Sequence, residues 1–162
     1  MAFVTAGSVA SLCCVLFLYT KNGGEIKFSI LGVLLFYTVM LVSIFAHEFL
    51  HGLTWSLYCK NGWKSIHLGV MWKKLTPYCC CMESLSFGQY LLGGLMPFIV
   101  LGLGIFVVSF ITNSIFLLVL SIFNIIAAGG DTTIAVMLLK HKNAFIIDHP
   151  TKCGFWAFSK EM

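Results

Sequence analysis

His47, Glu48 and His51 form an H-E-x-x-H pentad inside an apolar stretch long enough to be a membrane helix. Residues four apart lie on one face of a helix, so both imidazoles can reach one metal ion. Glu48 lies beside His47 around the helix, where it can accept a proton from an attacking water. Because ionisable groups inside a membrane are costly, the pentad predicts a zinc site with a general base. The alternative is a polar patch that lines a helix interface or a proton path.

A third ligand is needed, because a catalytic zinc usually takes three from the protein. Of the six acidic residues, only Glu48 and Asp131 fall inside predicted membrane spans. Asp131 lies nine residues before Lys140, and His51 lies nine residues before Lys60. At the helical rise, both lie about 13–14 Å from their lysine, so their depths match. We therefore expect Asp131 to complete the site for one Zn²⁺, the alternative being a hydrogen bond at a helix interface.

Two further polar residues are weaker candidates for binding substrate. Asn124 lies two helical turns before Asp131 and could bind a substrate carbonyl or the oxyanion. An interhelical hydrogen bond is its more ordinary role. His67 lies in a strand-like loop, while His141 and His149 have the settings of surface residues.

The composition excludes several classes of protein. The chain of 162 residues is 59% hydrophobic and 10% charged, whereas soluble domains carry about 25% charged residues. We therefore predict a single polytopic membrane domain over residues 1–162. All ten basic residues are lysines, and the net charge of +4 fits membrane topology rather than nucleic-acid binding.

Seven cysteines are present, an odd number without the spacing of a secreted disulfide framework. We expect reduced thiols. Cys79, Cys80 and Cys81 could bind a metal with Cys59 or His67, but consecutive cysteines lack C-x-x-C spacing. Packing or lipidation is the alternative.

Four apolar runs predict an all-α membrane protein with about four transmembrane helices. They cover residues 2–19, 28–58, 87–111 and 114–139, and the last two are joined by a tight turn at Thr112-Asn113. In the 59–85 loop, apolar residues alternate from Ile66 to Trp72, which predicts a short strand, with a second one near Leu75–Cys81 forming a hairpin. An amphipathic loop lying on the membrane is the alternative.

Lysine positions predict the orientation. Eight of the ten fall in the 59–85 loop and in the tail 140–162, and only Lys21 and Lys27 fall on the other side. The positive-inside rule then places the loop, the tail and both termini in the cytoplasm, with the spans in the inner or plasma membrane.

The chain resembles a domain-of-unknown-function family of small bacterial membrane proteins classed as zincin peptidases, and it shares a ground plan with the site-2 proteases. The matching segments are Ala46–Gly52, Pro77–Cys79, Gly93–Phe98, Gly130–Asp131, Asp148–Pro150 and Gly154–Phe155. The resemblance implies one Zn²⁺ held by His47, His51 and Asp131, with Glu48 as the general base.

The segment around Asp131 departs from the site-2 pattern. In that family a glycine follows the aspartate, whereas here Gly129 and Gly130 precede Asp131 and Thr132 follows it. Substrate and regulation are therefore not carried over from the site-2 proteases.

The predicted function is a membrane-embedded zinc endopeptidase that cleaves membrane or membrane-proximal proteins within the lipid bilayer. A helical substrate hides its peptide bonds, and the edge of residues 65–73 could hold it extended by strand addition. One alternative is a non-catalytic membrane zinc-binding protein or metal carrier. Another is a peptidase that trims loops at the membrane surface.

Overall fold

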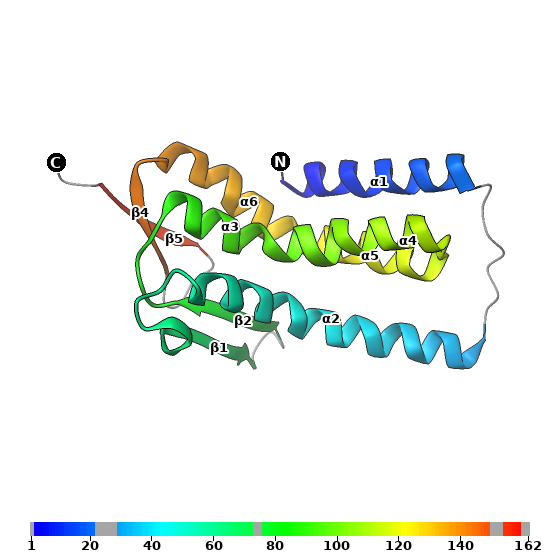
Figure 1. Ribbon diagram of the computed structural model, residues 1–162, viewed down its shortest axis with the longest axis horizontal. Helices are drawn as coiled ribbons and strands as arrows, with labels where there is room; N and C mark the ends of the chain where they lie inside the picture. The colour runs from blue at the N-terminus through cyan, green and yellow to red at the C-terminus, as the bar shows by residue number, and fades with distance from the viewer. Residues whose placement is uncertain (1, 22–28, 73–75, 150–153, 160–162) are drawn as a thin grey trace.

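The computed structural model describes residues 2–21, 29–72, 76–149 and 154–159. These residues are mostly helical, and two small antiparallel sheets lie together at one end of the long axis (Figure 1). The helices are α1 (Ala2–Lys21), α2 (Ile30–Ser56), α3 (Phe87–Pro97), α4 (Ile105–Thr112), α5 (Ile115–Ala127) and α6 (Gly129–Leu138). A π-helical segment, Phe98–Gly104, joins α3 to α4 into one continuous helix.

Among the described residues, two helices are long and apolar enough to cross a membrane, namely α2 and the continuous helix Phe87–Thr112. A third candidate is the pair formed by α5 and the helix Gly129–His141, which is bent by 43° at Ala128. Within α1, the apolar helix among the described residues is Gly7–Leu18, which is shorter than the candidate spans. The structure therefore gives two or three candidate spans, and the prediction of four is not confirmed.

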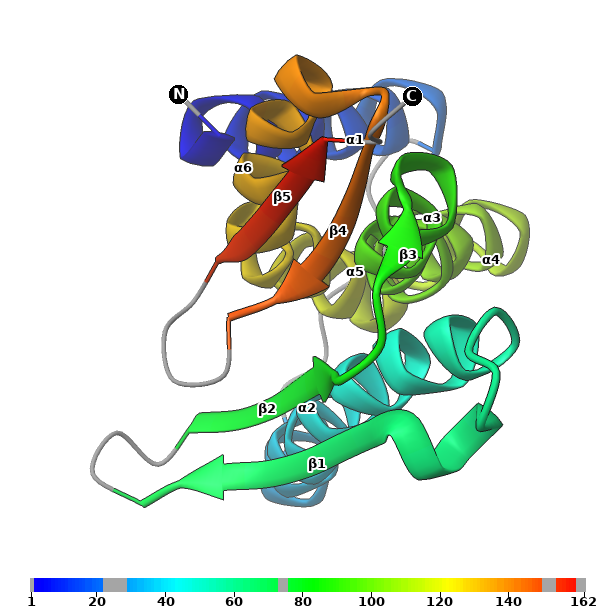
Figure 2. The ribbon, with the colours of Figure 1, turned by 90° about the vertical axis from the view of Figure 1, so that its left-hand side faces the viewer.

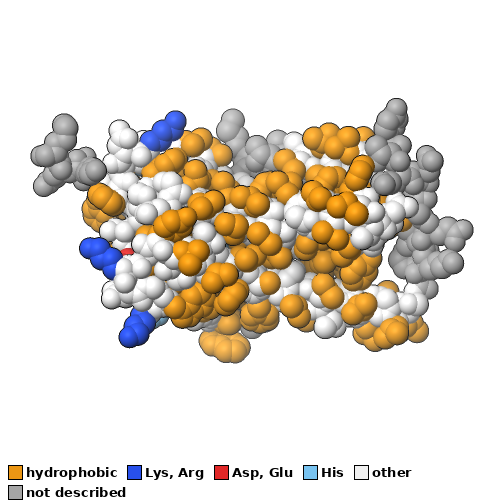
Figure 3. Space-filling model, viewed as in Figure 1, with side chains coloured by type: hydrophobic (Ala, Val, Ile, Leu, Met, Phe, Trp, Pro, Cys, Tyr) orange, Lys and Arg blue, Asp and Glu red, His pale blue; other side chains and the backbone are white. Residues whose placement is uncertain are grey.

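The outer surface of the helices is apolar. Exposed large apolar side chains follow α2 from Ile30 to Leu41, and the lysines visible in Figure 3 lie at the end that carries the sheets. A water-soluble monomer rarely exposes so much contiguous apolar surface. This distribution is consistent with membrane association.

The two sheets differ in how far apart their strands lie in the sequence. The predicted hairpin is present, with β1 (Ile66–Met71) and β2 (Thr76–Cys81) antiparallel; of the predicted second strand, Leu75 lies outside the described residues. The other sheet has the order β3-β4-β5 and joins β3 (Leu85–Ser86) to β4 (Ala144–Asp148) and β5 (Phe155–Ser159) (Figure 2). The all-α prediction is therefore corrected, because the tail 140–162 contains two strands. Of these strands, β4 pairs with β3, which lies about 60 residues earlier in the chain, a distance over which local patterns carry no signal.

Turns and caps fix how the helices connect. Asn113 adopts a left-handed conformation with φ 54° between α4 and α5, which confirms the tight turn predicted at Thr112-Asn113. The hydroxyl of Ser29 accepts a hydrogen bond from Gly32 N–H at 3.0 Å and caps α2. In Figure 1, α5 and α6 run in the same direction as α2.

Close packing holds the β1–β2 hairpin against α2. At Gly52 a Cβ atom would lie 2.8 Å from Ile66 Cγ2 and 3.2 Å from Cys79 Sγ, so only glycine lets the hairpin approach the helix this closely. A buried cluster continues from there through α3, α6 and β4, and includes Trp55, Leu85, Tyr90, Leu138 and Ile146. This cluster is the core on which the candidate site rests.

Candidate metal centre

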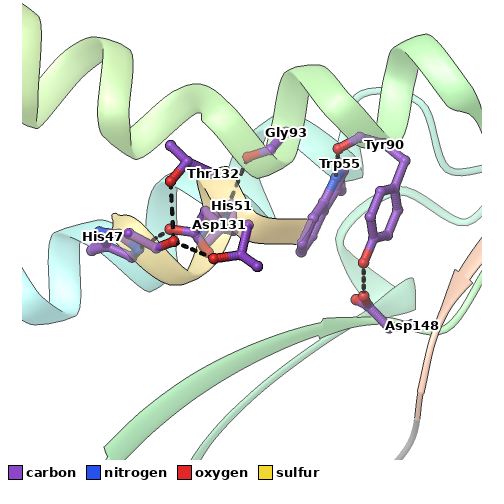
Figure 4. A network of polar contacts seen from close by, with 10 residues as sticks. His47, His51, Trp55, Tyr90, Gly93, Asp131, Thr132 and Asp148 are labelled. Atoms are coloured by element: carbon purple, nitrogen blue, oxygen red, sulfur yellow. Dashed lines mark hydrogen bonds and ion pairs between the residues drawn. The ribbon is translucent and has the colours of Figure 1, made fainter. Parts of the chain in front are cut away.

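His47 and His51 lie one turn apart in the second half of α2, and Asp131 lies in the first turn of α6. His47 Nε2 is 3.0 Å from Asp131 Oδ2, and His51 Nε2 is 3.5 Å from Asp131 Oδ1 (Figure 4). One possible ligand atom from each residue lies within 4.8 Å of the other two. The structure thus brings Asp131 beside the two histidines, as the matched depths predicted.

The donor set suits zinc. Two imidazole nitrogens and one carboxylate oxygen are the ligands of many catalytic zinc sites, which leave a fourth position open. Beside His51 and Asp131 there is a cavity of about 30 Å³, large enough for a water molecule. Its other lining residues are Trp55, Tyr90, Leu91, Gly94, Ile134, Ala135 and Leu138. The residues present therefore fit a zinc ion, with room for a water molecule beside His51 and Asp131.

His51 is fixed on two sides. It is buried, its Nδ1 lies 2.8 Å from the Gly93 carbonyl oxygen, and its ring stacks on Trp55 with centroids 5.2 Å apart. Trp55 Nε1–H in turn donates to the Tyr90 carbonyl at 3.1 Å. Contacts of this kind hold a ligand ring in one orientation before any metal binds.

Asp131 owes its position to the break between α5 and α6. The helix bends at Ala128, and the Gly129 carbonyl accepts hydrogen bonds from the hydroxyls of Thr132 and Thr133 at 3.0 and 2.7 Å. Asp131 therefore lies at a helix N-terminus, where the dipole favours a carboxylate. The single span predicted over 114–139 missed this break, although two adjacent glycines are a known sign of a helix interruption.

Glu48 faces the hairpin. The backbone N–H of Cys79 is a hydrogen-bond partner of its carboxylate, and Glu48 also lines a groove of about 590 Å³ between α2 and the hairpin. The remaining lining residues are Val42, Phe45, Ala46, Phe49, Leu68, Gly69, Val70, Pro77 and Tyr78. A carboxylate next to the three possible ligands thus opens onto an otherwise uncharged groove.

The weaker candidates lie elsewhere. Asn124 is buried, and its amide donates to the Leu120 carbonyl of its own helix at 2.9 Å. His67 is exposed on β1 opposite Cys80. His141 is exposed near Phe155. No hydrogen bond or ion pair in the described part of the chain joins these residues to the His47–His51–Asp131 group, so the substrate roles of Asn124 and His67 stay predictions.

The cysteines of β2 behave as packing residues. Cys59 and Cys81 are buried with their sulfur atoms 3.4 Å apart, and the described cysteines are free thiols. Burial raises the pKa of Cys80 to about 11 and raises those of Cys79 and Cys81 as well. Among the described residues, the group that could hold a metal ion does not include these cysteines, so the packing alternative suits them better.

Sequence reasoning missed a connection made by the tail. The Tyr90 hydroxyl donates to Asp148, and the Cys81 N–H donates to Asp148 Oδ2 at 2.6 Å. One carboxylate therefore ties β4 to α3 and β2, and Figure 4 shows the contact with Tyr90. Burial raises the pKa of Asp148. The resemblance had included Asp148, but only the spatial neighbours show what this residue contacts.

A comparison with known families identifies the chain. The family model described as "Putative zincin peptidase" matches residues 39–146, which include the pentad, the hairpin and Asp131. The chain belongs to this family. No curated protein and no solved structure matches it.

Proposed function

We propose that the chain is a membrane-embedded zinc metalloendopeptidase of the site-2-protease type, with one Zn²⁺ held by His47, His51 and Asp131. The observation that carries this proposal is the meeting of their ligand atoms within 4.8 Å, although Asp131 is 80 residues from His51 in sequence. Membership of the zincin peptidase family and the helical spacing of the pentad support it.

Glu48 is the proposed general base. Zinc in such a site supplies a Lewis acid that polarises a peptide carbonyl and makes a water easier to deprotonate. Glu48 takes the proton of the attacking water and returns it to the departing amine. The Cys79 N–H holds the carboxylate on the side of the groove, where a substrate can reach it.

The proposed substrate is an apolar segment of a membrane or membrane-proximal protein. The groove that Glu48 lines is bordered by apolar side chains of α2 and the hairpin. The edge proposed to hold the substrate extended by strand addition is that of residues 65–73, because Leu68, Gly69 and Val70 line the same groove as Glu48. An extended segment in this groove would present its backbone to Glu48.

The proposed topology has four spans in the cell membrane, with the sheets and both termini in the cytoplasm. In support, α1 packs against α5 and α6 as part of the same bundle. The described lysines outside α1 are Lys60, Lys64, Lys140 and Lys142, and they all belong to the end that carries the sheets. The positive-inside rule favours this end for the cytoplasm.

The first test replaces the base. Glu48→Gln should keep stoichiometric zinc and lower cleavage of quenched-fluorescent apolar peptides in detergent by about 10²- to 10⁴-fold, the usual contribution of a general base. Zinc by elemental analysis and initial rates are measured on the same sample. A fully active Glu48→Gln protein contradicts the proposal, and metal flux that survives the substitution in proteoliposomes would favour a carrier.

The second test concerns the ligands. Asp131→Ala should lose stoichiometric zinc. The control is Asn124→Ala, which removes a buried polar group from the adjoining helix and should retain the zinc. Zinc retained by Asp131→Ala would mean that His47 and His51 bind the metal with another partner.

A further inference from the structure

Pro97 lies inside a helix, where a proline removes one backbone donor. In an α-helix the N–H of each residue bonds to the carbonyl four residues earlier, so an N–H at position 97 would donate to the Gly93 carbonyl. Proline has no N–H to give. The next donor, Phe98 N–H, bonds to the Leu95 carbonyl instead. The Gly93 carbonyl is therefore available to a partner outside its own helix.

That partner is His51 of the neighbouring helix. His51 Nδ1 lies 2.8 Å from the Gly93 oxygen, and both groups are buried. A carbonyl can only accept, so Nδ1 carries the hydrogen. In the neutral imidazole the unprotonated nitrogen is then Nε2, the atom that lies 3.5 Å from Asp131 Oδ1 in the candidate metal centre.

Gly93 makes this approach possible. A Cβ atom at position 93 would lie 2.2 Å from both Cδ1 and Nε1 of Trp55, whose ring stacks on His51. The backbone of α3 can therefore reach His51 of α2 only because position 93 carries no side chain. Gly93 allows the close approach of the two helices, and Pro97 leaves the Gly93 carbonyl free to accept from His51.

We propose that Pro97 is a positioning residue for the metal centre: by withholding an N–H from the Gly93 carbonyl, it keeps His51 in the tautomer whose Nε2 can bind a metal. The proposal rests on the proposed zinc site. An N–H at position 97 would turn the Gly93 carbonyl toward its own helix axis and loosen the hydrogen bond to His51. Removing such a supporting contact usually weakens metal binding by about 10- to 100-fold.

The test measures tautomer and affinity in the full chain in detergent. Nitrogen-15 NMR of histidine-labelled, zinc-free protein at about pH 9, where ordinary imidazoles are neutral, distinguishes the two tautomers. The His51 signal is assigned with His51→Gln. Wild type should show Nδ1–H, and Pro97→Ala should show a mixture and bind zinc about 10- to 100-fold more weakly in competition with a chromophoric chelator. Met96→Ala alters the same helical turn without adding a donor and should leave both readouts unchanged.

Several results would overturn the proposal. One is Nε2–H at His51 in the wild type, which needs no variant to be seen. Another is an unchanged tautomer in folded Pro97→Ala, even if zinc affinity falls, because the proline would then be merely structural. Pro97→Ser restores the same N–H and replaces Pro97→Ala if that protein does not fold. Failure of the proposed function can be told apart from failure of this proposal. A wild type that binds no zinc would contradict the proposed function, but its NMR spectrum would still show the tautomer of His51.

Discussion

The two halves of α2 lie in different surroundings. In the first half, residues 30–46, no residue is charged, and the apolar side chains of Ile30, Leu31, Leu34, Tyr37 and Leu41 are 60–83% exposed. In the second half, residues 47–56, the buried residues are His51, Gly52, Thr54 and Trp55. One helix therefore passes from a surface suited to lipid into a packed site.

This difference shows where the chain is sensitive to single atoms. On its exposed side the first half needs only to remain apolar and helical, because contact with lipid is unspecific. In the second half, hydrogen bonds and close approaches at Gly52 and Gly93 set distances to within tenths of an ångström. We expect substitutions to act through polarity in the first half and through shape in the second.

A charge in the first half should have the largest effect. Leu41 is 61% exposed near the centre of the span, and Leu41→Lys should cost about 3 kcal/mol of membrane insertion. Leu57, 74% exposed just beyond α2 and near Lys60, is the matched control. Insertion is measured by glycosylation mapping in microsomes. Equal insertion of Leu41→Lys and Leu57→Lys would mean that the first half does not contact lipid.

A single methyl group should be enough to disturb the second half. Gly93→Ala would drive a Cβ atom into Trp55 at 2.2 Å, and overpacking of this kind typically destabilises by about 1–3 kcal/mol. The neighbouring Gly94 has open space at the same point, so Gly94→Ala should leave the thermal midpoint within error. Circular dichroism in detergent compares the two proteins. If both midpoints fall equally, helix flexibility rather than the contact with Trp55 is what matters.

The same contrast explains what the sequence could predict. Local signals were enough for α2, for the helix from Phe87 to Thr112 and for the hairpin, because periodicity and apolar length are properties of neighbouring residues. They were also enough to bring Asp131 to the histidines, since a depth can be counted along each helix from its lysines. All these predictions depend on one segment at a time.

What was missed depends on contacts between segments. The β3-β4-β5 sheet pairs Leu85 with Ile146, and Asp148 gains its role only when β4 lies beside Cys81 and Tyr90. The bend at Ala128 shortens what looked like one span. Pro97 was visible, but its effect on the Gly93 carbonyl matters only because His51 lies on the neighbouring helix.

The pH dependence of stability should also separate the two parts of the molecule. Glu83, between β2 and β3, accepts hydrogen bonds from the N–H groups of Lys60 and Asn61 and from the Ser65 hydroxyl, which lower its pKa to about 2. The unfolded chain then binds a proton that the folded chain does not. The stability from Glu83 is present above the ordinary pKa of 4.5 and is lost as the pH falls toward 2. Acid unfolding followed by circular dichroism should lose this dependence in Glu83→Gln, and an unchanged acid profile would contradict the role of Glu83.

Asp148 should respond to pH with the opposite sign. It is buried in the same part of the molecule, and burial raises its pKa above 3.8, so the folded state binds the proton more readily than the unfolded chain. Its contribution to stability is present at low pH and is lost as the pH rises through the folded pKa. Asp148→Asn keeps an acceptor for the Cys81 N–H without the charge, so its stability relative to wild type should increase with pH. The first half of α2 has no group that titrates in this range. Paired acid and alkaline scans of Glu83→Gln and Asp148→Asn should therefore shift the melting of the sheets in opposite directions, and parallel shifts would show that burial does not set the charge of Asp148.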